Sequence, residues 1–173
     1  MKSRQGVIFD LDQILIDGRL AEAARQARKW GEVYKSIPRL TPYPGIAELL
    51  RWLSSRGIGV GIVTSRPARY CELVVQRWGW SVNARVCFGD TPSRKPSPEP
   101  IVLCLKRLGV TAADAVLVGA DVHDIRAAKS AAVFSVAAQW GTQEKDKVLE
   151  ACPDAECATV SDLKELLTGR FGL

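Results

Sequence analysis

Several features that would mark a membrane or secreted protein are missing from this sequence of 173 residues. No apolar stretch approaches the length of about 20 residues that crosses a bilayer. The apolar run near the N-terminus, Gly6 to Phe9, is broken at once by Asp10 and Asp12, which is not the pattern of a secretory signal. An internal repeat, a low-complexity tract and an interdomain linker are also lacking. We therefore expect a single domain over residues 1–173 without a membrane partner.

The cysteines lack the even pairing of a disulfide framework. The chain has five of them: Cys71, Cys87, Cys104, Cys152 and Cys157. We expect buried free thiols in a reducing compartment, and hence a cytoplasmic location. Cys152 and Cys157 have no second pair nearby, which argues against a zinc site.

Positive charge is present, with a formal net charge of +5, but no basic run is interleaved with aromatic residues. Nucleic acid is therefore not an expected partner. The densest basic stretch, residues 19–39, includes Arg25 and Lys35 and is interpreted as the solvated face of a helix. The oligomeric state stays open, because five tryptophans leave room for an apolar surface patch.

Short apolar runs alternate with segments of helical periodicity along the chain. The runs predict strands at residues 6–9, 58–63, 85–88, 115–118, 133–137 and 158–160. Helices are predicted at residues 19–36, about 46–57, 67–79, 101–109, 122–131 and 145–151, and after an N-cap at Ser161. This alternation indicates an α/β protein with a central parallel sheet between two layers of helices.

Polar residues stand in four places at or between the predicted strand ends. They are Asp10-Leu11-Asp12, Thr64-Ser65-Arg66, Lys95-Pro96 and the segment from Gly119 to Asp124. In open α/β sheets ligands bind beyond the carboxyl ends of the strands, so the four segments can converge there. Together they offer a carboxylate nucleophile, a second carboxylate for proton transfer, hydroxyl and backbone donors, a cation and metal-ligating acids. Those are the parts that phosphoryl transfer requires.

Each segment also has a purely structural interpretation. The Asp10 and Asp12 pair fits a turn after a strand. Thr64 and Ser65 fit an N-cap of the next helix, and a loop lysine is usually solvated. Asp121 and Asp124 have the spacing of a capping pair at the start of a helix. The presence of all four segments in order favours the functional interpretation of the first pair.

These motifs resemble those of the haloacid dehalogenase (HAD) superfamily, phosphatase branch, over about residues 6–168. Asp10-Leu11-Asp12 is similar to the first motif, Thr64 to the second, Lys95-Pro96 to the third, and Gly119 to Asp124 to the fourth. The resemblance implies a Rossmann-like core and a Mg²⁺-dependent phosphomonoester hydrolase. The helical insert at about residues 18–42 is short, which implies a minimal cap. The implied substrate is a small phosphorylated molecule, with a larger one as the alternative.

The resemblance also implies a role for each matched residue. Asp10 would become a transient aspartyl phosphate, and Asp12 would act as general acid and then as general base. Thr64 and nearby backbone N–H groups would hold the phosphoryl oxygens, and Lys95 would offset the charge around Asp10. Ser65 and Arg66, beside the second motif, are further candidates for substrate binding, Arg66 for a second anionic group. Mg²⁺ would be bound by Asp10, by the backbone carbonyl of Asp12, and by the acids Asp121 and Asp124.

Two of the departures from the family pattern concern the site. Gln13 stands where a glycine is usual, and it loses the freedom of glycine at that turn. Ala120 stands where the family has an Asp that is a principal metal ligand. Either Asp121 takes its place, or Asp124 serves with an extra water, or metal binding is weak. The alternative function is therefore a HAD-fold binding or regulatory protein with weak or lost catalysis. His123, the only histidine, is interpreted as a surface residue.

Overall fold

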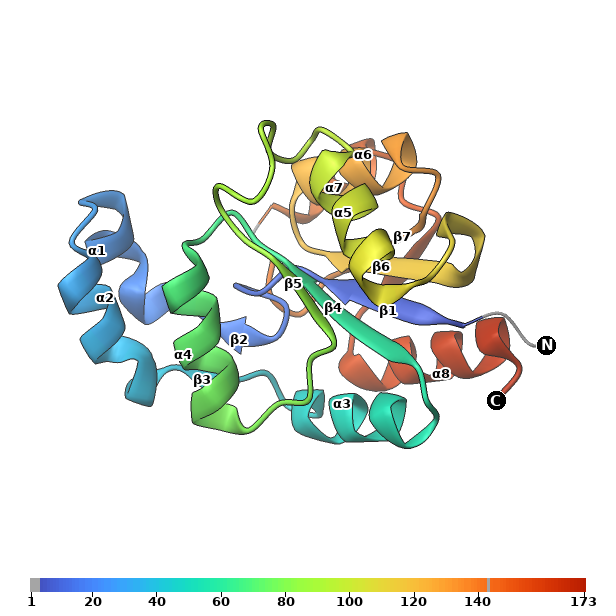
Figure 1. The fold of residues 1–173 in the computed structure, drawn as a ribbon, viewed down its shortest axis with the longest axis horizontal. Helices are drawn as coiled ribbons and strands as arrows, with labels where there is room; N and C mark the ends of the chain where they lie inside the picture. The colour runs from blue at the N-terminus through green and yellow to red at the C-terminus, as the bar shows by residue number, and fades with distance from the viewer. Residues whose placement is uncertain (1–3, 143) are drawn as a thin grey trace.

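The computed structural model describes residues 4–142 and 144–173, and its centre is a sheet of six parallel strands (Figure 1). The strand order is β5–β4–β1–β6–β7–β8. Their bounds are β1 Gly6–Phe9, β4 Gly59–Val63, β5 Ala84–Val86, β6 Ala115–Gly119, β7 Phe134–Ala138 and β8 Ala155–Cys157. The predicted α/β fold class is confirmed.

β1 lies in the middle of the sheet because all four of its residues are buried and can face helices on both sides. Phe9 is in register with Ile62 of β4 and with Val118 of β6. Parallel strands in this register bring their carboxyl ends to one edge. The residues that follow these three strands therefore lie together.

Helices cover both faces of the sheet and complete the α/β/α arrangement (Figure 1). α3 Ile46–Ser55, α4 Ala68–Trp78 and α8 Val160–Phe171 pack with Val7 and Phe9 in one apolar core. α5 Glu99–Leu108 and α6 Val122–Ser130 pack with Ile8 on the other face. α7 Lys145–Glu150 contacts α6 through Val148, and the 3₁₀ turn η3 spans Ala112–Asp114. Alternate side chains of β1 thus enter opposite cores.

The predicted helix at residues 19–36 is wrong, because the chain forms two short helices there. η1 Arg19–Ala21 and α1 Glu22–Gln26 are followed by α2 Trp30–Ser36 and η2 Ile37–Arg39. Arg28 has a φ of 55°, which ends the first helix in the left-handed region. An antiparallel ribbon of β2 Ile16–Asp17 and β3 Thr41–Pro42, which was not predicted, encloses this insert. The insert lies beside α4, at the end of the molecule away from both termini (Figure 1).

The last predicted strand, at residues 158–160, is also wrong. The sixth strand is β8, three residues earlier, where Cys157 pairs with Ala138. Val160 is apolar because it is a buried first residue of α8, not because it belongs to a strand. Thr159, rather than Ser161, is the N-cap: its Oγ1 accepts the N–H of Asp162 at 3.1 Å, and the Asp162 carboxylate accepts the N–H of Thr159 at 2.8 Å.

The five cysteines are free thiols, and four are buried as expected, while Cys152 is exposed. In the described ranges, no helix is both long and apolar enough to cross a bilayer. The single domain over residues 1–173 stays a prediction, and its residues 1–3 and 143 lie outside the described part of the chain.

Candidate active site

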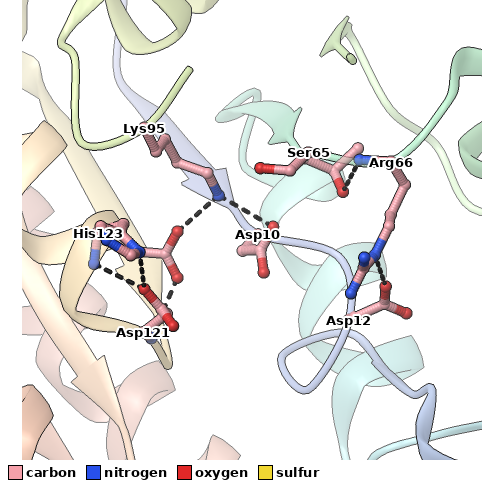
Figure 2. Close-up of a pocket in the computed structure, with 9 residues that line it drawn as sticks. Asp10, Asp12, Ser65, Arg66, Lys95, Asp121 and His123 are labelled. Carbon is pink, nitrogen blue, oxygen red and sulfur yellow. Dashed lines mark hydrogen bonds and ion pairs between the residues drawn. The ribbon is translucent and has the colours of Figure 1, made fainter. Parts of the chain in front are cut away.

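The four predicted segments meet around one polar pocket of about 200 Å³ at the carboxyl edge of β1, β4 and β6 (Figure 2). It is lined by Asp10, Asp12, Thr64, Ser65, Arg66, Lys95, Asp121, His123 and Asp124. A second pocket of about 380 Å³ shares Asp10, Asp12, Arg66 and Asp121 with the first and extends toward the insert. The structure therefore brings together all eight residues predicted for the site.

Lys95 lies between two carboxylates at the floor of the pocket. Its Nζ is 3.1 Å from Oδ1 of Asp10 and 2.5 Å from Oδ1 of Asp124, and it also donates to the carbonyl of Val63 at 3.1 Å. Its side chain is 7% exposed. The interpretation of Lys95 as a solvated loop residue is therefore wrong, and the ammonium group is held next to Asp10 (Figure 2).

The pKa of Asp10 is strongly perturbed by its surroundings. The pKa of Asp10 is raised to about 7: burial is the largest cause, Lys95 opposes it, and the charges of Asp124 and Asp12 add to the rise. The two carboxylates next to Lys95 raise its pKa against the effect of burial, so it stays protonated. A carboxylate with such a perturbed pKa in a cleft is a typical feature of a reactive group.

Asp12 is held by three side chains. Its Oδ2 accepts from Nε of Arg66 at 2.7 Å, and its Oδ1 accepts from Nη1 of Arg25 at 3.1 Å and from the hydroxyl of Tyr70 at 2.8 Å. Burial and the charge of Asp12 raise the pKa of Tyr70, so its hydroxyl keeps the proton that it donates. The carboxylate of Asp12 is 7% exposed.

Arg25 and Tyr70 were missed by the sequence analysis. Arg25 was assigned to a solvated helix face, but its side chain is only 2% exposed, so that interpretation is wrong for this residue. The sequence offered no signal for this burial, because Arg25 stands in a strongly basic stretch whose charges usually face solvent. Tyr70 lies within a predicted helix, where nothing in the sequence distinguishes it from a residue of the apolar core.

Thr64 and Ser65 do not cap the following helix. The N-cap of α4 is Pro67, and no side chain caps it. The buried Oγ1 of Thr64 instead accepts the backbone N–H of Arg66 at 3.2 Å. Ser65 is exposed at the pocket rim (Figure 2). Binding of phosphate by these two residues stays a prediction.

The two acids of the fourth segment form the capping pair that was considered for them. Oδ1 of Asp121 accepts the N–H of His123 at 2.7 Å, and Oδ2 of Asp124 accepts the N–H groups of Ala120 and Asp121, each at 3.2 Å. Because Lys95 occupies the other oxygen of Asp124, this buried carboxylate is fully engaged. Asp121 is more than half exposed, pairs with the exposed His123 at 2.9 Å, and faces the pocket (Figure 2).

The oxygen donors at the pocket suit Mg²⁺ in type, since it prefers hard carboxylate and carbonyl ligands. Asp10, Asp12 and Asp121 line the pocket. Among the described residues, however, no three or more His, Cys, Asp or Glu side chains are grouped to hold a metal ion. Position 120 holds an alanine, where the motif that the sequence resembles has an aspartate. The metal set of Asp10, Asp12, Asp121 and Asp124 stays a prediction, and the geometry favours Asp121 over Asp124.

Replacing Lys95 with Met is expected to destabilise the fold by about 3 kcal/mol at pH 8, because two buried carboxylates lose their cation. The loss should be smaller near pH 5, where Asp10, with its pKa of about 7, is protonated in the folded protein. Urea denaturation at both pH values measures this. Lys147→Met is the control, since that exposed side chain pairs only at the surface. Equal losses in the two variants would contradict the expectation.

The chain matches the family described as haloacid dehalogenase-like hydrolase over residues 19–138. It is 30% identical over 169 residues to a phosphoglycolate phosphatase of Pseudomonas savastanoi pv. phaseolicola, covering 96% of this chain and 60% of that protein. It is 34% identical to an N-acetylmuramic acid 6-phosphate phosphatase of Pseudomonas aeruginosa, covering 58% of this chain and 45% of that protein. The chain thus spans about half the length of these relatives.

Solved structures have the same fold at low sequence identity. A HAD phosphatase from Thermococcus onnurineus superposes with a TM-score of 0.78 at 22% identity, covering 95% of this chain and 98% of that one. A hydrolase from Pseudomonas syringae superposes with a TM-score of 0.80 at 19% identity, covering 96% and 99%. This likeness concerns the arrangement of the core.

Proposed function

The chain belongs to the haloacid dehalogenase-like hydrolases, and we propose that it hydrolyses phosphomonoesters through a covalent phosphoryl intermediate on Asp10. The observation that carries the proposal is the environment of Asp10. Its carboxylate follows the central strand, opens into a polar pocket and accepts from Lys95 on one oxygen. No other described residue bonds to its second oxygen, which can attack phosphorus.

Two steps follow from these positions. In the first, the second oxygen of Asp10 forms a bond to phosphorus and the bond from phosphorus to the leaving oxygen breaks. Asp12 enters this step in its acid form and gives its proton to that oxygen. In the second, Asp12 takes a proton from water as the water attacks phosphorus, and the bond to Asp10 breaks. Inorganic phosphate leaves, and both carboxyl groups return to their starting states.

The remaining residues hold the phosphoryl group. Lys95 offsets the negative charge that collects around Asp10, and the hydroxyl of Thr64 with nearby N–H groups faces the transferred oxygens. Arg66 and Ser65 stand at the rim for the rest of the substrate. Mg²⁺ would be held by Asp10, the carbonyl of Asp12 and Asp121, with Asp124 behind them, and when bound it would neutralise charge on the phosphoryl oxygens.

We further propose a small phosphorylated molecule as the substrate and the cytoplasm as the location. The names of both relatives specify phosphates of small molecules. The second pocket, next to Arg19 and Thr142, offers room for the leaving group. The five free thiols suit a reducing compartment. A larger substrate is the alternative, because the insert between β2 and β3 consists of short helices only.

A specific observation favours a second candidate, a binding or regulatory protein with weak catalysis. Ala120 places a methyl group where the family pattern has a metal-binding carboxylate, and the other acid of that segment is engaged by Lys95. Such a protein would bind phosphorylated ligands without rapid turnover.

The test of the first candidate is phosphate release from p-nitrophenyl phosphate in the presence of Mg²⁺. We expect turnover that EDTA abolishes and that added Mg²⁺ restores, because the charge around Asp10 requires a cation. Absence of phosphate release at high enzyme concentration with millimolar Mg²⁺ would contradict the proposal and favour the second candidate.

A further inference from the structure

A buried arginine connects the insert to the proposed acid–base residue. Arg25 belongs to α1, and its guanidinium is 2% exposed although it carries a full charge. Nη1 donates to Oδ1 of Asp12 at 3.1 Å and to the hydroxyl of Tyr70 at 3.3 Å. Nη2 donates to the carbonyl of Gly18 and to the carboxylate of Glu22, each at 2.6 Å. A charged group with four acceptors is fixed in both position and direction.

The two oxygens of Asp12 have different surroundings. Oδ1 faces the buried pair of Arg25 and Tyr70, neither of which lines the pocket. Oδ2 faces Arg66, whose side chain is 32% exposed and lines both pockets. Oδ2 is therefore the oxygen that pairs with a pocket-lining side chain (Figure 2).

Gly18 shows how closely this pair is packed. A Cβ at Gly18 would lie 2.4 Å from Oδ1 of Asp12 and 2.7 Å from Nη1 of Arg25. Both distances are far below contact distance, and both atoms belong to the same ion pair. The backbone of Gly18 has a φ of −88°, which alanine adopts without strain. A methyl group there would thus displace the ion pair without changing any charged side chain.

We propose that Arg25 is a positioning residue for Asp12: it anchors Oδ1 so that Oδ2 is presented to the leaving oxygen of the substrate. The inference rests on the proposed phosphatase activity. It assigns the insert a part in the chemistry, because α1 supplies the charged partner that, together with Tyr70, fixes the direction of the proton donor. Burying a guanidinium is costly unless its partners are well placed, which suits a role in fixing geometry.

The effect of a misplaced proton donor depends on the leaving group. p-Nitrophenolate leaves readily without protonation, whereas the alkoxide of an alkyl phosphate needs the proton. The ratio kcat/KM reports steps up to the first irreversible one, which here is formation of the phosphoenzyme. A loss of positioning should therefore lower kcat/KM for glycerol 2-phosphate much more than for p-nitrophenyl phosphate.

The test compares both substrates with four variants: Gly18→Ala, Arg25→Met, Arg25→Lys and Gly31→Ala. We expect Gly18→Ala and Arg25→Met to lower kcat/KM for glycerol 2-phosphate by about 10²-fold, and for p-nitrophenyl phosphate by less than about threefold. Arg25→Lys should recover part of the loss, since a cation returns. Gly31→Ala, in α2 of the same insert, is the control, because a Cβ there meets nothing within 4 Å.

The outcomes separate the two proposals. If the unaltered protein hydrolyses both substrates and Gly18→Ala or Arg25→Met lowers both equally, the positioning role is overturned and a structural role is left. The same holds if neither variant changes either substrate. If the unaltered protein hydrolyses neither substrate, the phosphatase proposal itself fails and this inference with it. Circular dichroism of each variant checks folding, and Gly18→Ala decides the question if Arg25→Met does not fold.

Discussion

Replacing Asp10 with Asn is expected to abolish phosphate release, lowering kcat by at least about 10³-fold. The amide keeps the size and shape of the side chain, but its oxygen cannot form the bond to phosphorus that the first step requires. Steady-state release of phosphate from p-nitrophenyl phosphate measures the loss. Asp146→Asn is the matched control, because that aspartate is exposed at the start of α7, outside both pockets.

The same variant should gain stability while it loses activity. The pKa of Asp10 is raised from 3.8 to about 7, so the folded protein favours the protonated form. The contribution of this group to the free energy of unfolding is therefore full below about pH 4 and is lost as the pH rises through 7. Asp10→Asn removes that loss, and we expect a gain of about 2 kcal/mol at pH 8 and almost none at pH 4.

Urea denaturation at pH 4, 6 and 8 follows this gain directly. A variant that is inactive and more stable only at high pH would identify Asp10 as a charged group that destabilises the fold and that catalysis requires. Retained turnover in the Asn variant would contradict the covalent mechanism. Lower stability at every pH would instead mean that Lys95 needs the charge of Asp10 for folding.

Replacing Ala120 with Asp is expected to tighten Mg²⁺ binding by about 10-fold to 100-fold. The change adds a carboxylate ligand at the position where the family pattern has one and this chain has alanine. Ala120 is partly exposed and lines the second pocket together with Asp10 and Asp121. Its backbone N–H is already held by Asp124, so the new side chain would start from a fixed position. At limiting Mg²⁺, turnover should rise with affinity.

Titration calorimetry with Mg²⁺ alone measures the affinity without reference to activity. Ala120→Asn is the control, since the amide has nearly the same volume and no charge. A large gain in both affinity and turnover would favour the second candidate function for the natural protein, a binder with weakened catalysis. An already active protein whose affinity does not change would show that Asp121 or solvent fills the place of the missing carboxylate.

The sequence by itself determined the class of the fold and the composition of the pocket. Apolar runs such as Gly6 to Phe9 alternate with helical periods, and this alternation requires a parallel sheet between helices. Parallel strands end at one edge, so the polar residues after β1, β4 and β6 had to lie together. Those relations follow from local periodicity, which is visible in one sequence.

The tertiary structure alone decided which of these groups are free and which are engaged. The contact of Arg25 with Asp12 joins the insert to the loop after β1, and a helical period does not encode such a contact. Likewise, Asp124 is engaged by Lys95, 29 positions away, while Asp121 is left at the surface. Ion pairs between distant residues depend on burial and on the competition among partners, and only the folded chain sets these.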